Sequence, residues 1–89
     1  MALVHGQVTI TTSATLIHKA GADGDSDTLH IHCPSGGQSV FIGGASVTAA
    51  NGFELKAGSG DLVFNLEAGD SVYGTVAATT QGISYLAIP

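Results

Sequence analysis

Two histidines at alternate positions, His30 and His32, are the residues whose type and spacing could support chemistry. Alternate residues of a β-strand project from one face, so two imidazoles can approach a single cation, as in zinc and iron sites built on strands. Two ligands do not make a site, and no histidine follows His32. We therefore expect no bound metal and no cofactor. If a metal ion does bind, His30 and His32 are the candidate ligands. The alternative is that both are partly exposed histidines on a sheet face or at a subunit contact.

Segment 24–32 resembles the first half of the cupin motif, in which a glycine precedes a His-x-His pair. This resemblance implies a cupin-like metal-binding protein that would use His30 and His32. The match ends there, because the next positions hold cysteine, proline, serine and glycine where cupins have a glutamate, and the third histidine is absent. The sequence spacing gives no reason to group His5 or His18 with His30 and His32. We expect each of these two histidines to lie at a strand end. Histidines gathered around an oligomer axis would instead make assembly depend on pH.

Cys33 is the only cysteine, so the chain cannot form an internal disulfide or a thiolate metal cluster. It has the same strand parity as Leu29 and Ile31, which predicts a buried, inert thiol with a raised pKa. The sequence contains no Gly-x-Ser-x-Gly elbow, phosphate-binding loop or dinucleotide fingerprint. We therefore expect that the protein is not an enzyme.

Composition and the alternation of apolar residues predict an all-β chain. Gly occurs 13 times, Thr, Ser, Val and Ile are abundant, and helix-forming residues are scarce. Alternation marks strands at 8–16, 28–33, 38–42, 61–67, 71–77 and 83–88, with short pieces at 46–48 and 53–55. We expect a small β-sandwich or jelly-roll-like barrel of about seven antiparallel strands. It would be a single domain over residues 1–89, with residues 1–7 a candidate N-terminal arm.

The N-terminal half carries two local predictions. In segment 8–16 the parity places Leu16 on the inward face. Ile17 has the opposite parity, which marks a bulge or a corner where the strand crosses between sheets. Residues 20–27 are rich in Asp, Gly and Ser and predict a solvated loop that includes Asp27.

The middle of the chain carries further predictions about pairing and core. Segment 38–42 is expected to be the strand that returns after 28–33, because turn residues separate the two. Asn51-Gly52 is the strongest short hairpin signal in the chain. Phe53 and Phe64 are expected in the core.

The charge balance excludes several classes of partner. Charged residues make up 10% of the chain, the formal net charge is -5, and Lys19 and Lys56 are the only cations besides the histidines. Ordinary binding to nucleic acid or to an anionic membrane is therefore not expected. The first residues do not form an export signal, and we expect a soluble product. So few charges predict that other chains cover much of the surface, and we expect a homo-oligomer.

From Ser39 to the end, the chain resembles a pattern that recurs in small β-structured virion proteins of tailed bacteriophages. The residues that carry it are Val40-Phe41-Ile42-Gly43-Gly44, Val47-Thr48, Asn51-Gly52-Phe53-Glu54-Leu55, Ala57-Gly58, Leu66, Ala68-Gly69-Asp70, Val72-Tyr73-Gly74 and the last strand, Ile83 to Leu86. In that family the pattern occurs in head decoration or cement proteins, minor capsid subunits and tail-fibre modules. The resemblance covers roughly the C-terminal half of the chain.

This resemblance implies a capsid-stabilising head decoration protein. Such a protein would be made in the host cytoplasm and would bind the major capsid protein on the outer surface of the virion as a homotrimer. Its acidity suits the outside of the shell rather than the DNA-facing interior. The alternative is a tail-fibre or baseplate module that binds host-surface carbohydrate, with Phe41, Tyr73 or Tyr85 as a stacking platform.

The N-terminal residues are the candidate contacts with other chains. Ala2, Leu3, Val4 and His5 precede the regular alternation and could pair with the exposed sheet edge of a neighbour. We therefore predict that these four residues belong to an interface.

Overall fold

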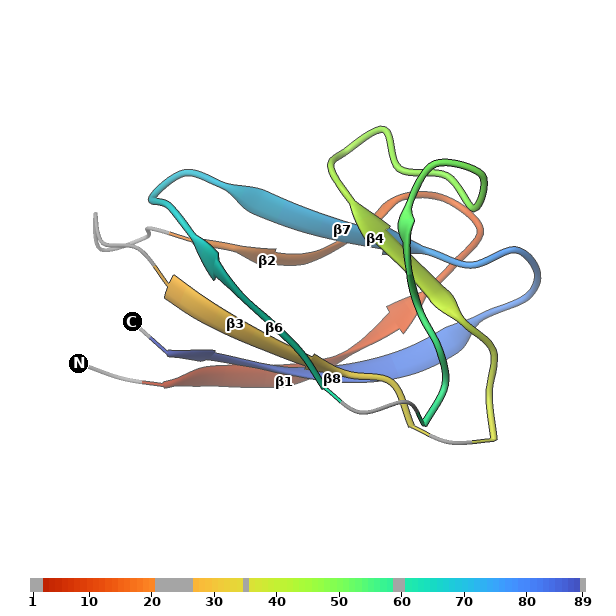
Figure 1. Cartoon of the computed structure of the whole chain (residues 1–89), viewed down its shortest axis with the longest axis horizontal. Helices are drawn as coiled ribbons and strands as arrows, with labels where there is room; N and C mark the ends of the chain where they lie inside the picture. Colours follow the sequence, from red (N-terminus) through yellow and green to blue (C-terminus); the bar gives the residue numbers. More distant parts are fainter. Residues whose placement is uncertain (1–2, 21–26, 35, 59–60, 89) are drawn as a thin grey trace.

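The computed structural model describes residues 3–20, 27–34, 36–58 and 61–88, which form eight β-strands (Figure 1). These are β1 (Val4–Ile10), β2 (Thr15–Lys19), β3 (Asp27–His32), β4 (Val40–Gly43), β5 (Phe53–Leu55), β6 (Asp61–Leu66), β7 (Ser71–Thr75) and β8 (Gln81–Ile88). The described residues contain no helix, so the predicted all-β class is confirmed, with eight strands where about seven were expected.

The strands form two antiparallel sheets that pack face to face (Figure 1). Sheet A has the order β1-β8-β3-β6, and sheet B has the order β2-β7-β4-β5. The chain therefore changes sheet at every connection except the one between β4 and β5. This alternation is the jelly-roll topology of two Greek keys, one of the two architectures that the sequence predicts.

Strand β4 does not return beside β3, so that prediction was wrong. β4 lies in sheet B and pairs with β5 and β7, whereas β3 lies in sheet A and pairs with β6 and β8. Turn residues reverse the chain but do not select the partner strand. The partner depends on which apolar faces can be buried together, and here the chain crosses to the opposite sheet.

The predicted strand 8–16 is two strands that lie in different sheets. β1 ends at Ile10, which is fully buried, and β2 begins at Thr15 after a corner. The predicted bulge is present at Ile17, where the pairing of β2 with β7 is shifted. Ile17 is buried, whereas Leu16 is 47% exposed. The inward assignment of Leu16 was wrong because the corner resets the parity of the chain.

The one connection that stays within a sheet joins β4 to β5 through a long loop. Ile42 pairs with Phe53, so the loop covers residues 44–52 and is not the two-residue turn predicted at Asn51-Gly52. A Cβ at Gly52 would lie 2.7 Å from the Cβ of Phe41. The glycine is therefore needed because the loop packs closely on the sheet, and not because the turn requires a positive φ.

The core fills the space between the two sheets. Its fully buried side chains follow the inward parity of their strands and include Ile10, Leu29, Ile31, Cys33 and Val40. Phe64 is partly buried and packs against this core, as expected. Phe53 was also expected in the core but is 63% exposed. Its strand has only three residues and lies at an outer edge of sheet B, where the second sheet does not cover the ring.

We predict that Gly74→Ala destabilises the protein, whereas Gly82→Ala does not. A Cβ at Gly74 would lie 3.1 Å from Ile17 Cδ1 and 3.2 Å from Val40 Cγ1, both core side chains. Such overpacking costs about 1–3 kcal/mol. A Cβ at Gly82, on the same kind of element, meets nothing within 4 Å. Urea unfolding of both variants checks this, and equal stabilities would contradict the packing account.

Candidate functional site

The outer face of sheet A brings three of the four histidines onto one surface. Across the strands, His5 lies opposite Leu86, Leu86 opposite His30, and His30 opposite Val63. His32 follows on the same face, in the next outward position of β3. His30 is half-buried, and His5 and His32 are exposed. The structure therefore groups His5 with the predicted pair, a grouping for which the sequence spacing held no signal.

These histidines do not converge on one point among the described residues. Strand β8 separates His5 from His30, and neighbouring strands are about 4.8 Å apart, so the two backbones are about 10 Å apart. Within the described ranges, no three His, Cys, Asp or Glu side chains gather closely enough to hold a metal ion. His30 and His32 point away from the core, so they cannot contribute to a site enclosed between the sheets. Gly24 of the cupin-like segment lies outside the described residues.

A shallow hollow of about 530 Å³ lies beside His32 on this face. It is lined by amide, hydroxyl and imidazole groups, among them those of Gln7, Thr9 and Ser84. Gly82 helps to form it, because this residue has no side chain to fill the space. The hollow therefore offers several hydrogen-bonding groups on one exposed surface.

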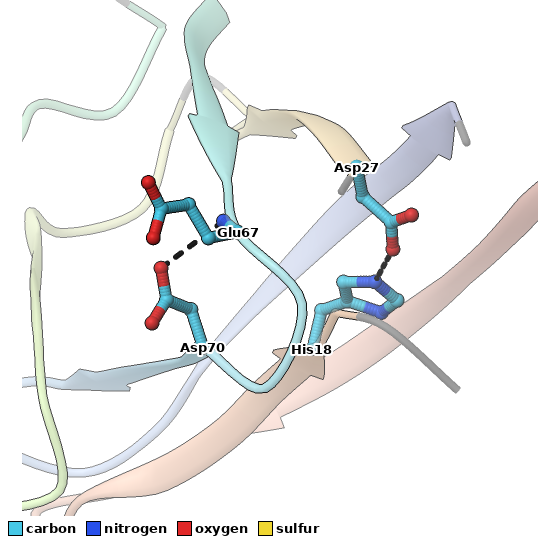
Figure 2. Close-up of polar contacts among 4 residues, drawn as sticks. All are labelled: His18, Asp27, Glu67 and Asp70. Carbon is cyan, nitrogen blue, oxygen red and sulfur yellow. Dashed lines mark hydrogen bonds and ion pairs between the residues drawn. The ribbon is translucent and has the colours of Figure 1, made fainter. Parts of the chain in front are cut away.

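His18 and Asp27 form an ion pair that joins the two sheets (Figure 2). His18 Nε2 lies 2.7 Å from Asp27 Oδ2, and each side chain is only 10% exposed. His18 belongs to β2 of sheet B, and Asp27 is the first residue of β3 in sheet A. The His18 ring also lies 5.8 Å from the ring of Tyr85. Asp27 was expected in a solvated loop, and that prediction was wrong because its carboxylate is held between the sheets by the imidazole.

The His18–Asp27 pair lies far along the strand from Cys33, the only thiol of the chain, and therefore does not activate it. Asp27 begins β3 and Cys33 follows its last residue, so about 20 Å of extended chain separates the two. Cys33 is 0% exposed and its Sγ donates a hydrogen bond to the carbonyl oxygen of Gln38 at 3.5 Å. Burial raises the pKa of the Cys33 thiol above its ordinary value. The prediction that the Cys33 thiol is buried and has a raised pKa is therefore confirmed.

The three aromatic residues considered as a stacking platform do not share a face. Tyr85 lies opposite Gly6 and Ile31 on the inner side of sheet A and packs against the core. Phe41 and Tyr73 are partly buried on sheet B, and the β4–β5 loop covers part of Phe41 through Gly52. Tyr85 therefore cannot act together with the other two on one surface.

The predicted N-terminal interface residues lie at the outer edge of sheet A. Val4 and His5 belong to β1, which pairs with β8 in register, so these two residues are part of the sheet. Leu3 is 59% exposed and Val4 is 45% exposed. Ala2 lies outside the described residues.

The part of the chain that the structure describes contains no helix that could span a membrane.

We predict that Asp27→Ala destabilises the protein by about 1–3 kcal/mol, the cost of leaving a buried partner unsatisfied. His18→Ala should cost a similar amount, and the double variant should cost less than the sum because both changes break one interaction. Asp70→Ala is the matched control. Asp70 is exposed and its Oδ2 accepts a hydrogen bond from the Glu67 backbone N–H at 3.1 Å (Figure 2). Additive effects in chemical unfolding would show that His18 and Asp27 are not coupled.

We predict that the stability falls as the pH rises above 9.0, the ordinary pKa of the cysteine thiol. Because burial raises the pKa of Cys33 in the folded protein, the unfolded chain loses this proton first. The stabilising contribution is complete below pH 9.0 and is lost as the pH approaches the raised value. Between about pH 8 and pH 10, the free energy of unfolding should fall more for wild type than for Cys33→Ala, by at most about 1.4 kcal/mol. Parallel curves of unfolding free energy against pH would contradict this.

Comparison with known proteins supports the fold alone. No protein-family model and no curated protein matches the sequence. Among solved structures, the chain is similar to a subunit of the Bacillus endospore appendages, described as a family of disulfide-linked pili. The TM-score is 0.64 at 19% identity, and the match covers 98% of this chain and 84% of that one. The likeness therefore shows that the two chains share a fold.

Proposed function

We propose that this protein is a non-enzymatic structural subunit, and specifically a head decoration protein of a tailed bacteriophage. One observation carries the proposal: a chain with 10% charged residues leaves large apolar side chains open to solvent. Six such side chains in the described residues are 38–63% exposed, namely Leu3, Val4, Leu16, Phe53, Val63 and Ile88. Exposed apolar surface with little surrounding charge is typical of surface that other protein chains cover.

The resemblance to phage virion proteins supports the specific form of the proposal. Several residues of that pattern are part of the scaffold: Val40, Leu55, Leu66 and Val72 are buried. Gly69, in the connection from β6 to β7, has a φ of 93°, which favours glycine. The pattern therefore describes how this fold is built, and capsid contacts would come from the exposed residues around it.

In this role the protein would bind the major capsid protein on the outside of the shell as a homotrimer, without a cofactor. Its net charge of -5 suits that surface, because an acidic subunit is repelled by DNA inside the shell. A ligand that binds the mature shell alone raises the free energy of opening it. Many copies around one shell would add their separate contributions.

A second candidate function is a subunit of a self-assembling extracellular appendage. The structural likeness to the pilus subunit favours it, since the match covers almost the whole of this chain. That relative is described as disulfide-linked. The only cysteine of this chain is fully buried, so an appendage built from it would need contacts other than disulfides between folded subunits.

The proposal is tested by mixing the purified protein with expanded, undecorated shells of the phage that encodes it. We expect saturable co-sedimentation at a fixed number of copies per shell, and a higher temperature of shell opening at saturation. Protein centrifuged without shells is the control. Absence of binding to shells would overturn the decoration proposal, and filaments in the control sample would favour the appendage.

A further inference from the structure

The four outer strands of the two sheets differ in how they are protected against pairing with another chain. An outer strand exposes unpaired backbone N–H and C=O groups along one side, which another strand can bind. Proteins block such pairing with short strands, bulges, prolines or charged side chains, lysine above all. In this protein the outer strands are β1 and β6 in sheet A and β2 and β5 in sheet B.

Both outer strands of sheet B carry these protective features. β2 has a bulge at Ile17 and ends with Lys19. β5 has only three residues, and the middle one is Glu54. Neither strand therefore offers a long, regular edge to a second chain.

Both outer strands of sheet A lack such protection. β1 has seven residues and contains no Lys, Arg, Asp, Glu or Pro, and its pairing with β8 runs unshifted from Val4 to Ile10. β6 has six residues, of which only the first, Asp61, is charged. Among the described strands, β1 pairs with β8 alone and β6 with β3 alone. Each strand therefore has one regular edge available.

The strand directions allow these two edges to join copies of the chain. Each neighbouring pair in sheet A is antiparallel, so β1 and β6 run in opposite directions. When a second copy continues the sheet in the same orientation, its β1 lies antiparallel to β6 of the first copy. The core-facing side of sheet A in the second copy then lies on the same side as that of sheet A in the first copy.

The apolar side chains beside β6 complement those of β1. A hollow of about 260 Å³ opens between β5 and β6 and is lined only by Ile42, Phe53, Leu62 and Phe64. On β1, Val4 and Val8 occupy the inward positions, and Val4 is 45% exposed. Any register that keeps the inner faces together places these valines on the side of the hollow. The valines of β1 in a second copy would therefore cover the apolar side chains that line the hollow beside β6.

We infer that the protein self-associates head to tail, through pairing of β1 in one copy with β6 in a second copy. Pairing of β1 with β1 would leave both β6 edges and their hollows open, whereas pairing of β1 with β6 covers both kinds of edge. Such a contact closes into a ring or continues as a filament, depending on the rotation between copies. This inference rests on the proposed function, because it names the contact through which a structural subunit would assemble.

Cross-linking between two separately purified variants tests the pairing. His5 and Val63 lie in the same row of the outer face, one on each available edge, and both are exposed. His5→Cys and Val63→Cys are mixed and treated with a short bifunctional thiol reagent, and peptide mapping locates the link. We expect dimers that link the two variants. Ala50→Cys, at an exposed loop position, replaces His5→Cys in the control mixture and should form at least about tenfold fewer links.

Lysine substitutions at the same edges provide the second measurement. Gln7→Lys and Val63→Lys should weaken self-association at least about tenfold, equal to about 1.4 kcal/mol, in sedimentation equilibrium. Ala50→Lys adds the same charge away from both edges and should leave association unchanged. A monomeric wild type, unchanged association of the edge variants, or links formed mainly between two His5→Cys chains would overturn the inference. Shell binding is measured separately on wild type, so failure of edge pairing and failure of the proposed function give different results.

Discussion

The structure depends on filling one thin layer between two sheets with apolar side chains from a short chain that has a single cysteine. Ile10, Leu29, Ile31 and Val40 are fully buried in this layer and come from strands of both sheets. The layer is filled so closely that a Cβ at Gly74 would lie only 3.1 Å from Ile17 Cδ1 and 3.2 Å from Val40 Cγ1. Because no internal disulfide can hold the sheets together, packing within this layer has to do so.

This packing determines where polar chemistry can lie. Every second residue of β3 points into the core, so His30 and His32 are directed to the outer face. The contact of His18 with Asp27 is a polar contact between side chains of different sheets. Because His18 and Asp27 are both nearly buried and 2.7 Å apart, their contact constrains how the two sheets align. Histidine and carboxylate therefore support the scaffold here.

The outer strands of the two sheets differ in length and regularity. Sheet B ends in a bulged strand on one side and a three-residue strand on the other. Sheet A ends in β1 and β6, which are longer and contain Asp61 as their only Asp, Glu, Lys or Arg residue. An even number of antiparallel strands has edges that run in opposite directions, so one sheet can continue into the next without reversal. The same topology that buries the core thus leaves one sheet able to extend.

The sequence by itself determined the strand class and the direction of most side chains, because alternation with a period of two is a local property of extended chain. It also located the bulge at Ile17 and the inward position of Cys33. Only the tertiary structure decided which strands pair, that Leu16 and Phe53 lie exposed, and that Asp27 meets His18. These features depend on contacts between residues distant in the chain or on the position of a strand within its sheet. Turn residues and parity carry no information about either.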